Sequence, residues 1–141
     1  MSGKKGLDKG KRAEREVVKL LQGIIDEVCE IRGIEAPRVE RNLLQANKGG
    51  SDIHGLEWLA LEVKHQESFN LSGWWKQTLE QATVGNRVPV LLYRKNHIKF
   101  RARLYGWMDG GKPNCGQWVV CDISLLDFLE WFRLKFNTEL D

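Results

Sequence analysis

The stretch 52–64 reads DIHGLEWLALEVK, and its pattern predicts two strands joined by a short turn at His54 and Gly55. Side chains alternate across a strand, so the leucines and the valine of the second strand share one face. Glu62 and Lys64 share the other face, about 6.5–7 Å apart along the strand. The apolar residues around them indicate a central position in a sheet.

Glu62 and Lys64 have a structural and a functional interpretation. Buried charges cost free energy unless they pair, bind an ion or face a cleft. From this strand alone, a structural ion pair or the solvated face of an edge strand explains them about as well as a site does. Asp52 favours the site, because the short connection brings it beside Glu62. Two carboxylates at this separation suit Mg²⁺, and Lys64 could orient or deprotonate an attacking water or stabilise charge on a phosphate.

A helix is predicted from about Lys9 to Ile31, and it carries a further acid. Its apolar residues recur with helical period at Val17, Val18, Leu20, Leu21, Ile24, Ile25 and Val28. At 100° per residue, Glu14 falls within the arc of this stripe, whereas Glu16 points to the opposite side. Glu14 could simply mark the edge of the buried face. Alternatively, the helix packs on the sheet and brings Glu14 to the two acids of the hairpin.

The rest of the chain supplies the elements of one domain. Residues 1–8, rich in Lys and Gly, are expected to form a flexible basic arm, and residues 9–141 a single domain. The other predicted elements are an extended piece at 38–44, a helix at 72–84, strands at 89–93, 98–105 and 118–122, and a helix at 123–136. This order indicates the α/β class, with a mixed central β-sheet flanked by α-helices.

The basic residues gather in two runs. The formal net charge is only +3, which is weak evidence for nucleic acid. One run comprises Lys4, Lys5, Lys9, Lys11, Arg12, Arg15 and Lys19, and the other Arg94, Lys95, Lys99, Arg101 and Arg103. Such local patches suit phosphate binding, although a solvated surface explains either run about equally well.

The cysteines and the hydropathy pattern bear on location. Cys29, Cys115 and Cys121 are odd in number and lack CxxC spacing, so we expect neither a disulfide framework nor a zinc site. This usage fits the reducing cytoplasm. No apolar run reaches the ~18 residues that a membrane span needs, and no signal peptide is expected.

Three motifs in succession resemble those of a known family. They are Lys9-Gly10-Lys11-Arg12-Ala13-Glu14-Arg15-Glu16 before an apolar helix, Gly50-Ser51-Asp52-Ile53, and Leu61-Glu62-Val63-Lys64. In order and spacing, residues 9–95 resemble the archaeal-type Holliday junction resolvases of the PD-(D/E)xK nuclease superfamily. Each motif alone is weak, but the succession is fairly specific. Ser51 stands where the superfamily's name has proline, and the C-terminal third shows no similarity.

The resemblance implies a restriction-endonuclease-like core, a homodimer and Mg²⁺-dependent nicking of four-way DNA junctions, with Mn²⁺ able to replace Mg²⁺. Matched by motif, Glu14, Asp52 and Glu62 would be catalytic acids that bind the metal. The backbone carbonyl of Val63 would complete the metal ligands, and Lys64 would be the catalytic lysine.

The residues expected to contact DNA are Lys9, Arg12, Arg15, Arg41, Lys48 and Gln77. Arg15 and Arg41 match arginines of the family, and Lys48 lies beside a glycine pair where it could contact phosphate. Some branches of the superfamily carry a glutamine near the metal on the helix after the ExK strand. Gln77 or Gln81 could be that residue, although a place on the helix surface is the simpler explanation for both.

The leading hypothesis is therefore a structure-specific endodeoxyribonuclease, and a Holliday junction resolvase is the first choice within that class. One alternative is another DNA nuclease of the same superfamily, of the repair, replication or restriction type. The alternative from a different class is a nucleic-acid-binding protein without catalysis, in which the acids only stabilise the fold.

Overall fold

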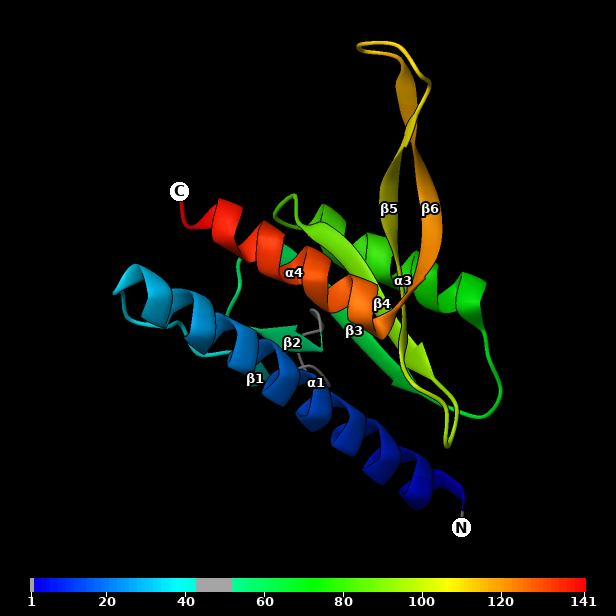
Figure 1. Cartoon of the computed structure of the whole chain (residues 1–141). Coiled ribbons are helices and arrows are strands. Elements are labelled where there is room, and N and C mark those ends of the chain that lie inside the picture. The colour runs from blue at the N-terminus through cyan, green and yellow to red at the C-terminus, as the bar shows by residue number, and fades with distance from the viewer. Residues whose placement is uncertain (1, 43–51) are drawn as a thin grey trace.

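The computed structural model describes residues 2–42 and 52–141, which form a six-stranded mixed sheet and three helices (Figure 1). In chain order the elements are α1 (Ser2–Arg32), β1 (Glu40–Arg41), β2 (Ile53–His54), β3 (Leu59–His65), α3 (Leu71–Thr83), β4 (Val88–Arg94), β5 (Arg101–Asp109), β6 (Gly116–Ser124) and α4 (Leu125–Glu139). The strands lie in the sheet in the order of the chain, and only β3 and β4 pair in parallel. The predicted class, helices around a mixed sheet, is confirmed.

Helix α3 makes the crossover that the parallel pair β3–β4 requires. Asn70 caps its first turn, where the side-chain oxygen accepts a hydrogen bond from the Gly73 N–H at 3.3 Å. After Thr83 the chain turns through Gly85 and Asn86, whose φ angles of 84° and 54° lie in the left-handed region. Glycine and asparagine adopt this region most readily, so the turn into β4 follows from local sequence.

The two faces of the sheet are covered by different helices. Apolar residues of α1 and α4 pack with Leu59, Leu61 and Val63 of β3 in the larger core. Trp74 and Trp75 of α3 pack on the other face, against Leu91 and Tyr93 of β4. Since side chains alternate along a strand, Glu62 and Lys64 belong to the face that carries α3. The alternation expected for this strand is confirmed.

Helix α1 begins at Ser2, seven residues before the expected start at Lys9. The segment expected to be a flexible arm is therefore helical from residue 2. Its glycines, Gly3 and Gly6, each disfavour a helix by about 1 kcal/mol relative to alanine, which lowers helix propensity without abolishing it. The helix ends where the sequence indicates, because Gly33 follows Arg32 with a φ of 70°.

The C-terminal elements differ from the prediction at their ends. Strand β5 begins at Arg101 rather than Ile98, because His97 takes a left-handed φ of 61° and the chain turns there. Strand β6 continues to Ser124, which then caps α4 by accepting a hydrogen bond from the Asp127 N–H at 3.1 Å. The hairpin β5–β6 is thus longer than expected and extends well beyond the helices (Figure 1).

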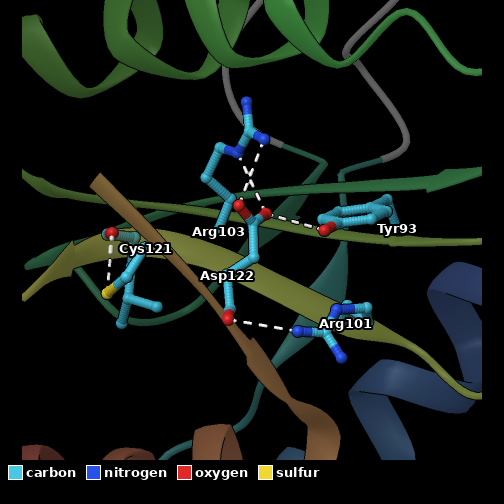
Figure 2. A network of polar contacts seen from close by, with 6 residues as sticks. Tyr93, Arg101, Arg103, Cys121 and Asp122 are labelled. Atoms are coloured by element: carbon cyan, nitrogen blue, oxygen red, sulfur yellow. Dashed lines mark hydrogen bonds and ion pairs between the residues drawn. The ribbon is translucent and has the colours of Figure 1, made fainter.

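A polar network on the α3 face ties three strands together at the base of this hairpin (Figure 2). Asp122 accepts hydrogen bonds from the Tyr93 hydroxyl at 2.6 Å and from two Arg103 nitrogens at 3.0 and 3.1 Å. Its backbone carbonyl accepts a further bond from Arg101. Burial opposes ionisation of Asp122, but the hydrogen bonds from Arg103 and Tyr93 and the arginine charges outweigh it. The pKa of Asp122 therefore lies below its ordinary value.

Replacing Asp122 by asparagine should destabilise the fold at neutral pH and not in acid. Charge-assisted hydrogen bonds contribute roughly 1.5–3 kcal/mol, so we expect Asp122→Asn to lower the free energy of unfolding by about 1–3 kcal/mol at pH 7. A carboxyl whose pKa is lowered on folding stabilises the protein above its unfolded pKa and loses this contribution as the pH falls through the folded pKa. The difference between wild type and variant should therefore shrink below pH ~4. Urea unfolding at pH 7 and pH 3 measures it.

The matched control is Asp141→Asn, which removes an exposed ion pair with Arg32. Such surface pairs contribute about 0–1 kcal/mol, so this variant should stay close to wild type at both pH values. A loss for Asp122→Asn that is as large at pH 3 as at pH 7 would contradict the role given to its charge.

Candidate metal and phosphate site

The β2–β3 hairpin brings two carboxylates close together. Ile53 pairs with Leu61 in the antiparallel register, and Asp52 directly precedes β2. The negative charge of Asp52 acts on Glu62, so the two carboxylates are near each other. The Asp52 backbone N–H donates to the Leu61 carbonyl at 3.1 Å, and the Asp52 Oδ2 accepts from the Val63 N–H at 2.7 Å. The expected proximity of Asp52 and Glu62 is confirmed.

The Glu62 carboxyl is fully buried and has no hydrogen-bond partner among the described residues. Its exposed fraction is 0%, and neither Oε1 nor Oε2 has a hydrogen-bond partner among the described residues. Burial, and next the negative charge of Asp52, raise the pKa of Glu62 to about 9, although the Lys64 ammonium opposes this. Leaving such a group unpaired is costly. A bound cation would supply the missing partner.

Glu14 approaches the same place from α1. Its Oε2 accepts a hydrogen bond at 3.0 Å from Arg41, the second residue of β1. Burial raises the pKa of Glu14, the Arg41 hydrogen bond opposes the rise, and the Asp52 charge adds to it. The Lys64 charge also acts on this carboxyl. Glu14 is therefore electrostatically coupled to the hairpin acids, as expected if the helix packs on the sheet.

Lys64 completes the group from the end of β3. Its side chain is half-buried, and its positive charge favours ionisation of both Glu62 and Glu14. In the described part of the chain, no group of three or more His, Cys, Asp or Glu side chains is arranged to hold a metal ion. Two carboxylates nevertheless fit Mg²⁺, which keeps several waters and needs only one or two such ligands from protein. Asp52 and Glu62, whose carboxylate has no hydrogen-bond partner among the described residues, are the pair that fits.

Val63 and Arg41 take part in ways that the sequence did not indicate. Val63 was expected to offer a backbone carbonyl to the metal, and here its backbone N–H also fixes the Asp52 side chain. The contact of Arg41 with DNA stays a prediction, and in the structure its Nε pairs with Glu14 at 3.0 Å. Sequence spacing alone gives no sign of either contact, since both cross between elements.

A basic hollow lies at the N-terminal part of α1. Its lining residues are Asp8, Lys9, Lys11, Arg12, Arg15 and Asn96. The structure thus brings together Lys9, Arg12 and Arg15, which were expected to contact DNA. The turn after β4 adds Asn96, which also hydrogen-bonds His65 of β3 at 2.9 Å. No sequence pattern indicated Asn96, because its place depends on how β4 packs beside α1.

Of the remaining predicted residues, Gln77 and Gln81 are half-buried on α3, the helix on the face of the sheet that carries Glu62 and Lys64. Lys48 lies outside the described residues. The second basic run is partly structural, because Arg94 pairs with Glu16 at 3.3 Å and Arg103 pairs with Asp122.

Comparisons with known proteins gave no match, either to a protein-family model or to a curated protein. In the described residues, no helix combines the length and the apolar character needed to cross a membrane. The chemistry of the site therefore carries the functional argument.

Magnesium should stabilise the fold through Glu62 and Asp52. A ligand that binds only the folded state adds about 2.7 kcal/mol at one hundred times its dissociation constant. We expect millimolar Mg²⁺ to raise the thermal unfolding midpoint of wild type, measured by circular dichroism, and to leave Glu62→Gln and Asp52→Asn unchanged.

The matched control is Glu57→Gln, which alters an exposed acid in the turn before β3 and should keep the full Mg²⁺ response. An equal shift in Glu62→Gln and wild type would mean that Mg²⁺ binds elsewhere.

Proposed function

We propose that this chain is a Mg²⁺-dependent endodeoxyribonuclease that hydrolyses DNA phosphodiesters at Asp52, Glu62 and Lys64, with Glu14 beside them. The observation that carries the proposal is the Glu62 carboxyl, which is buried beside Asp52 and has no hydrogen-bond partner among the described residues. A lysine one strand step away puts a positive charge next to this acidic pair. An acid pair that fits a hard cation, together with a lysine, is a combination suited to phosphoryl chemistry.

Each residue has a distinct role in this reaction. Asp52 and Glu62 would hold the ion, and Arg41 keeps the Glu14 carboxyl in place beside them. When bound, Mg²⁺ would act as a Lewis acid on the phosphate and lower the pKa of its water. The Lys64 ammonium would stabilise the charge that develops on the phosphoryl oxygens or orient the attacking water. The water oxygen would bond to phosphorus as the bond to the leaving 3′ oxygen breaks in line. The water would lose a proton to solvent, and the leaving 3′ oxygen would take up a proton from solvent to become a hydroxyl.

The basic hollow supports DNA as the substrate. Lys9, Lys11, Arg12 and Arg15 lie along α1 close in sequence to Glu14, so a bound phosphate backbone would lead toward the acids. Contacts of this kind position DNA without reading its sequence. Their number predicts binding that weakens steeply with salt.

The more specific parts of the proposal come from the resemblance to archaeal-type Holliday junction resolvases. These parts are the restriction-endonuclease-like core, the four-way junction as substrate, and the homodimer that would nick two strands. The mixed sheet with helices on both faces is compatible with such a core. A nuclease with another DNA preference, and a DNA-binding protein without catalysis, are the rival functions.

A cleavage assay separates these functions. Wild-type protein with Mg²⁺ is incubated with end-labelled four-way junction, linear duplex, flap and single-stranded DNA. We expect paired nicks on the junction, no cleavage by Asp52→Asn, and cleavage roughly 10²- to 10⁴-fold slower in Lys64→Met, because a group that stabilises the transition state is lost.

The matched control is Asp127→Asn, which changes an exposed acid on α4 and should cleave like wild type. Faster cleavage of linear duplex than of the junction would contradict the junction-resolvase hypothesis and would still support a nuclease. No metal-dependent cleavage of any of the four substrates would leave only the binding function.

A further inference from the structure

The β5–β6 hairpin carries an exposed aromatic surface on one of its faces. Cross-strand pairing joins Tyr105 to Val120 and Trp107 to Trp118, so these four side chains share that face. Trp107 and Trp118 are 51% and 66% exposed, which is unusual for tryptophan. Figure 1 shows that the outer part of the β5–β6 hairpin extends beyond the helices.

The aromatic rings are held in place rather than loosely exposed. The Trp107 and Trp118 rings meet edge to face with centroids 5.4 Å apart, and Tyr105 meets Trp75 of α3 at 5.5 Å. The Trp107 ring lies over Gly116, where a Cβ atom would come within 2.6 Å of it. Glycine is thus required there for the ring to lie flat against the backbone. Rigid rings lose little conformational entropy when a ligand stacks on them.

The same aromatic surface borders a hollow of about 680 Å³ at the base of the hairpin. Its lining includes Tyr105, Trp118 and Trp131 together with the cations Arg87 and Lys135, and no carboxylate from the part of the chain that the structure describes. Lys135 pairs with Glu139 at 2.8 Å. Among the described residues, Arg87 forms no ion pair. The hollow therefore offers aromatic faces beside a positive charge.

These features match an unpaired nucleotide better than a duplex. An unpaired base exposes a π face that stacks on tryptophan or tyrosine, and its phosphate suits an arginine. A duplex hides its base faces and is bound through rows of cations. Between residues 105 and 120 the hairpin has only Asp109 and Lys112 as charged side chains, so it lacks such a row.

We infer that the Tyr105–Trp107–Trp118 face of the β5–β6 hairpin, with Arg87, binds unpaired nucleotides of the DNA substrate by base stacking and phosphate contact. This deepens the proposed nuclease function and rests on it for the identity of the substrate. In register, Glu62, Leu91, Arg103 and Asp122 follow one another across the sheet. Three strand spacings and four residues along β6 then separate Glu62 from Trp118, roughly 20 Å. A DNA strand a few nucleotides long is long enough to span this distance.

The test is binding of a fluorescein-labelled oligo-dT to the full chain in EDTA, followed by fluorescence anisotropy. EDTA prevents cleavage, so the result does not depend on the nuclease activity. We expect Trp118→Ala and Trp107→Ala each to weaken binding roughly 5- to 100-fold, as for a lost stacking partner. Trp118→Phe should restore most of the affinity, because phenylalanine keeps a π face. Binding of a blunt duplex should change less than twofold in every variant.

The matched control is Leu134→Ala, which removes a 70% exposed apolar side chain from α4 and should bind like wild type. Thermal melting followed by circular dichroism shows which variants are folded. If the alanine variants are unfolded, Trp118→Phe is used to test the inference. Wild-type affinity for oligo-dT in Trp118→Ala, or no binding of oligo-dT by wild type, would overturn the inference. A third result would also overturn the inference: the wild type is a dimer, and the tryptophan variants are monomers with unchanged DNA affinity. A second copy of the chain would then cover this face. Weakened oligo-dT binding without any metal-dependent cleavage would uphold the stacking surface and reject the nuclease.

Discussion

The hydrogen bond from the Val63 N–H to the Asp52 carboxylate, 2.7 Å long, fixes the arrangement on which the site depends. Strand β2 has only two residues, so few backbone bonds hold its register against β3. The bond to the Asp52 side chain adds to the few backbone hydrogen bonds between β2 and β3. It also holds the Asp52 carboxylate beside Glu62. A one-residue slip would turn Asp52 to the other face and separate the two acids.

The two faces of the sheet carry different kinds of side chain. The larger core under α1 and α4 contains apolar side chains from β3, β4 and β5 and supplies the burial that stabilises the fold. The α3 face holds a smaller apolar cluster and the polar groups Glu62, Tyr93 and Asp122. Of these, Tyr93 and Asp122 satisfy each other, whereas Glu62 has no hydrogen-bond partner among the described residues. A buried carboxyl without a hydrogen-bond partner destabilises the protein unless it binds a ligand such as a cation. We therefore assign Glu62 a functional rather than a structural role.

The β2–β3 hairpin, the helix α3 and the amphipathic stripe of α1 could all be predicted from sequence, because each depends on local periodicity or on a nearby glycine. The proximity of Asp52 and Glu62 followed from a short turn. The Glu14–Arg41 pair, the place of Asn96 and the Tyr93–Asp122–Arg103 network could not be predicted, since they join residues that are distant in sequence. The glycines near the N-terminus make the sequence predict a start of α1 that is too late. The polar tip of the β5–β6 hairpin resembles a separate loop, so the sequence predicts strands that end too early.

The most direct test of a cation site at Asp52 and Glu62 is a crystal of the protein grown with Mn²⁺, examined for anomalous scattering. Mn²⁺ prefers the same oxygen ligands as Mg²⁺ and can be located unambiguously. We expect an anomalous peak within coordination distance of an Asp52 and a Glu62 carboxylate oxygen, and none there in a crystal of Glu62→Gln. Crystals that show no peak between these two side chains at saturating Mn²⁺, or a peak that persists in Glu62→Gln, would contradict the site.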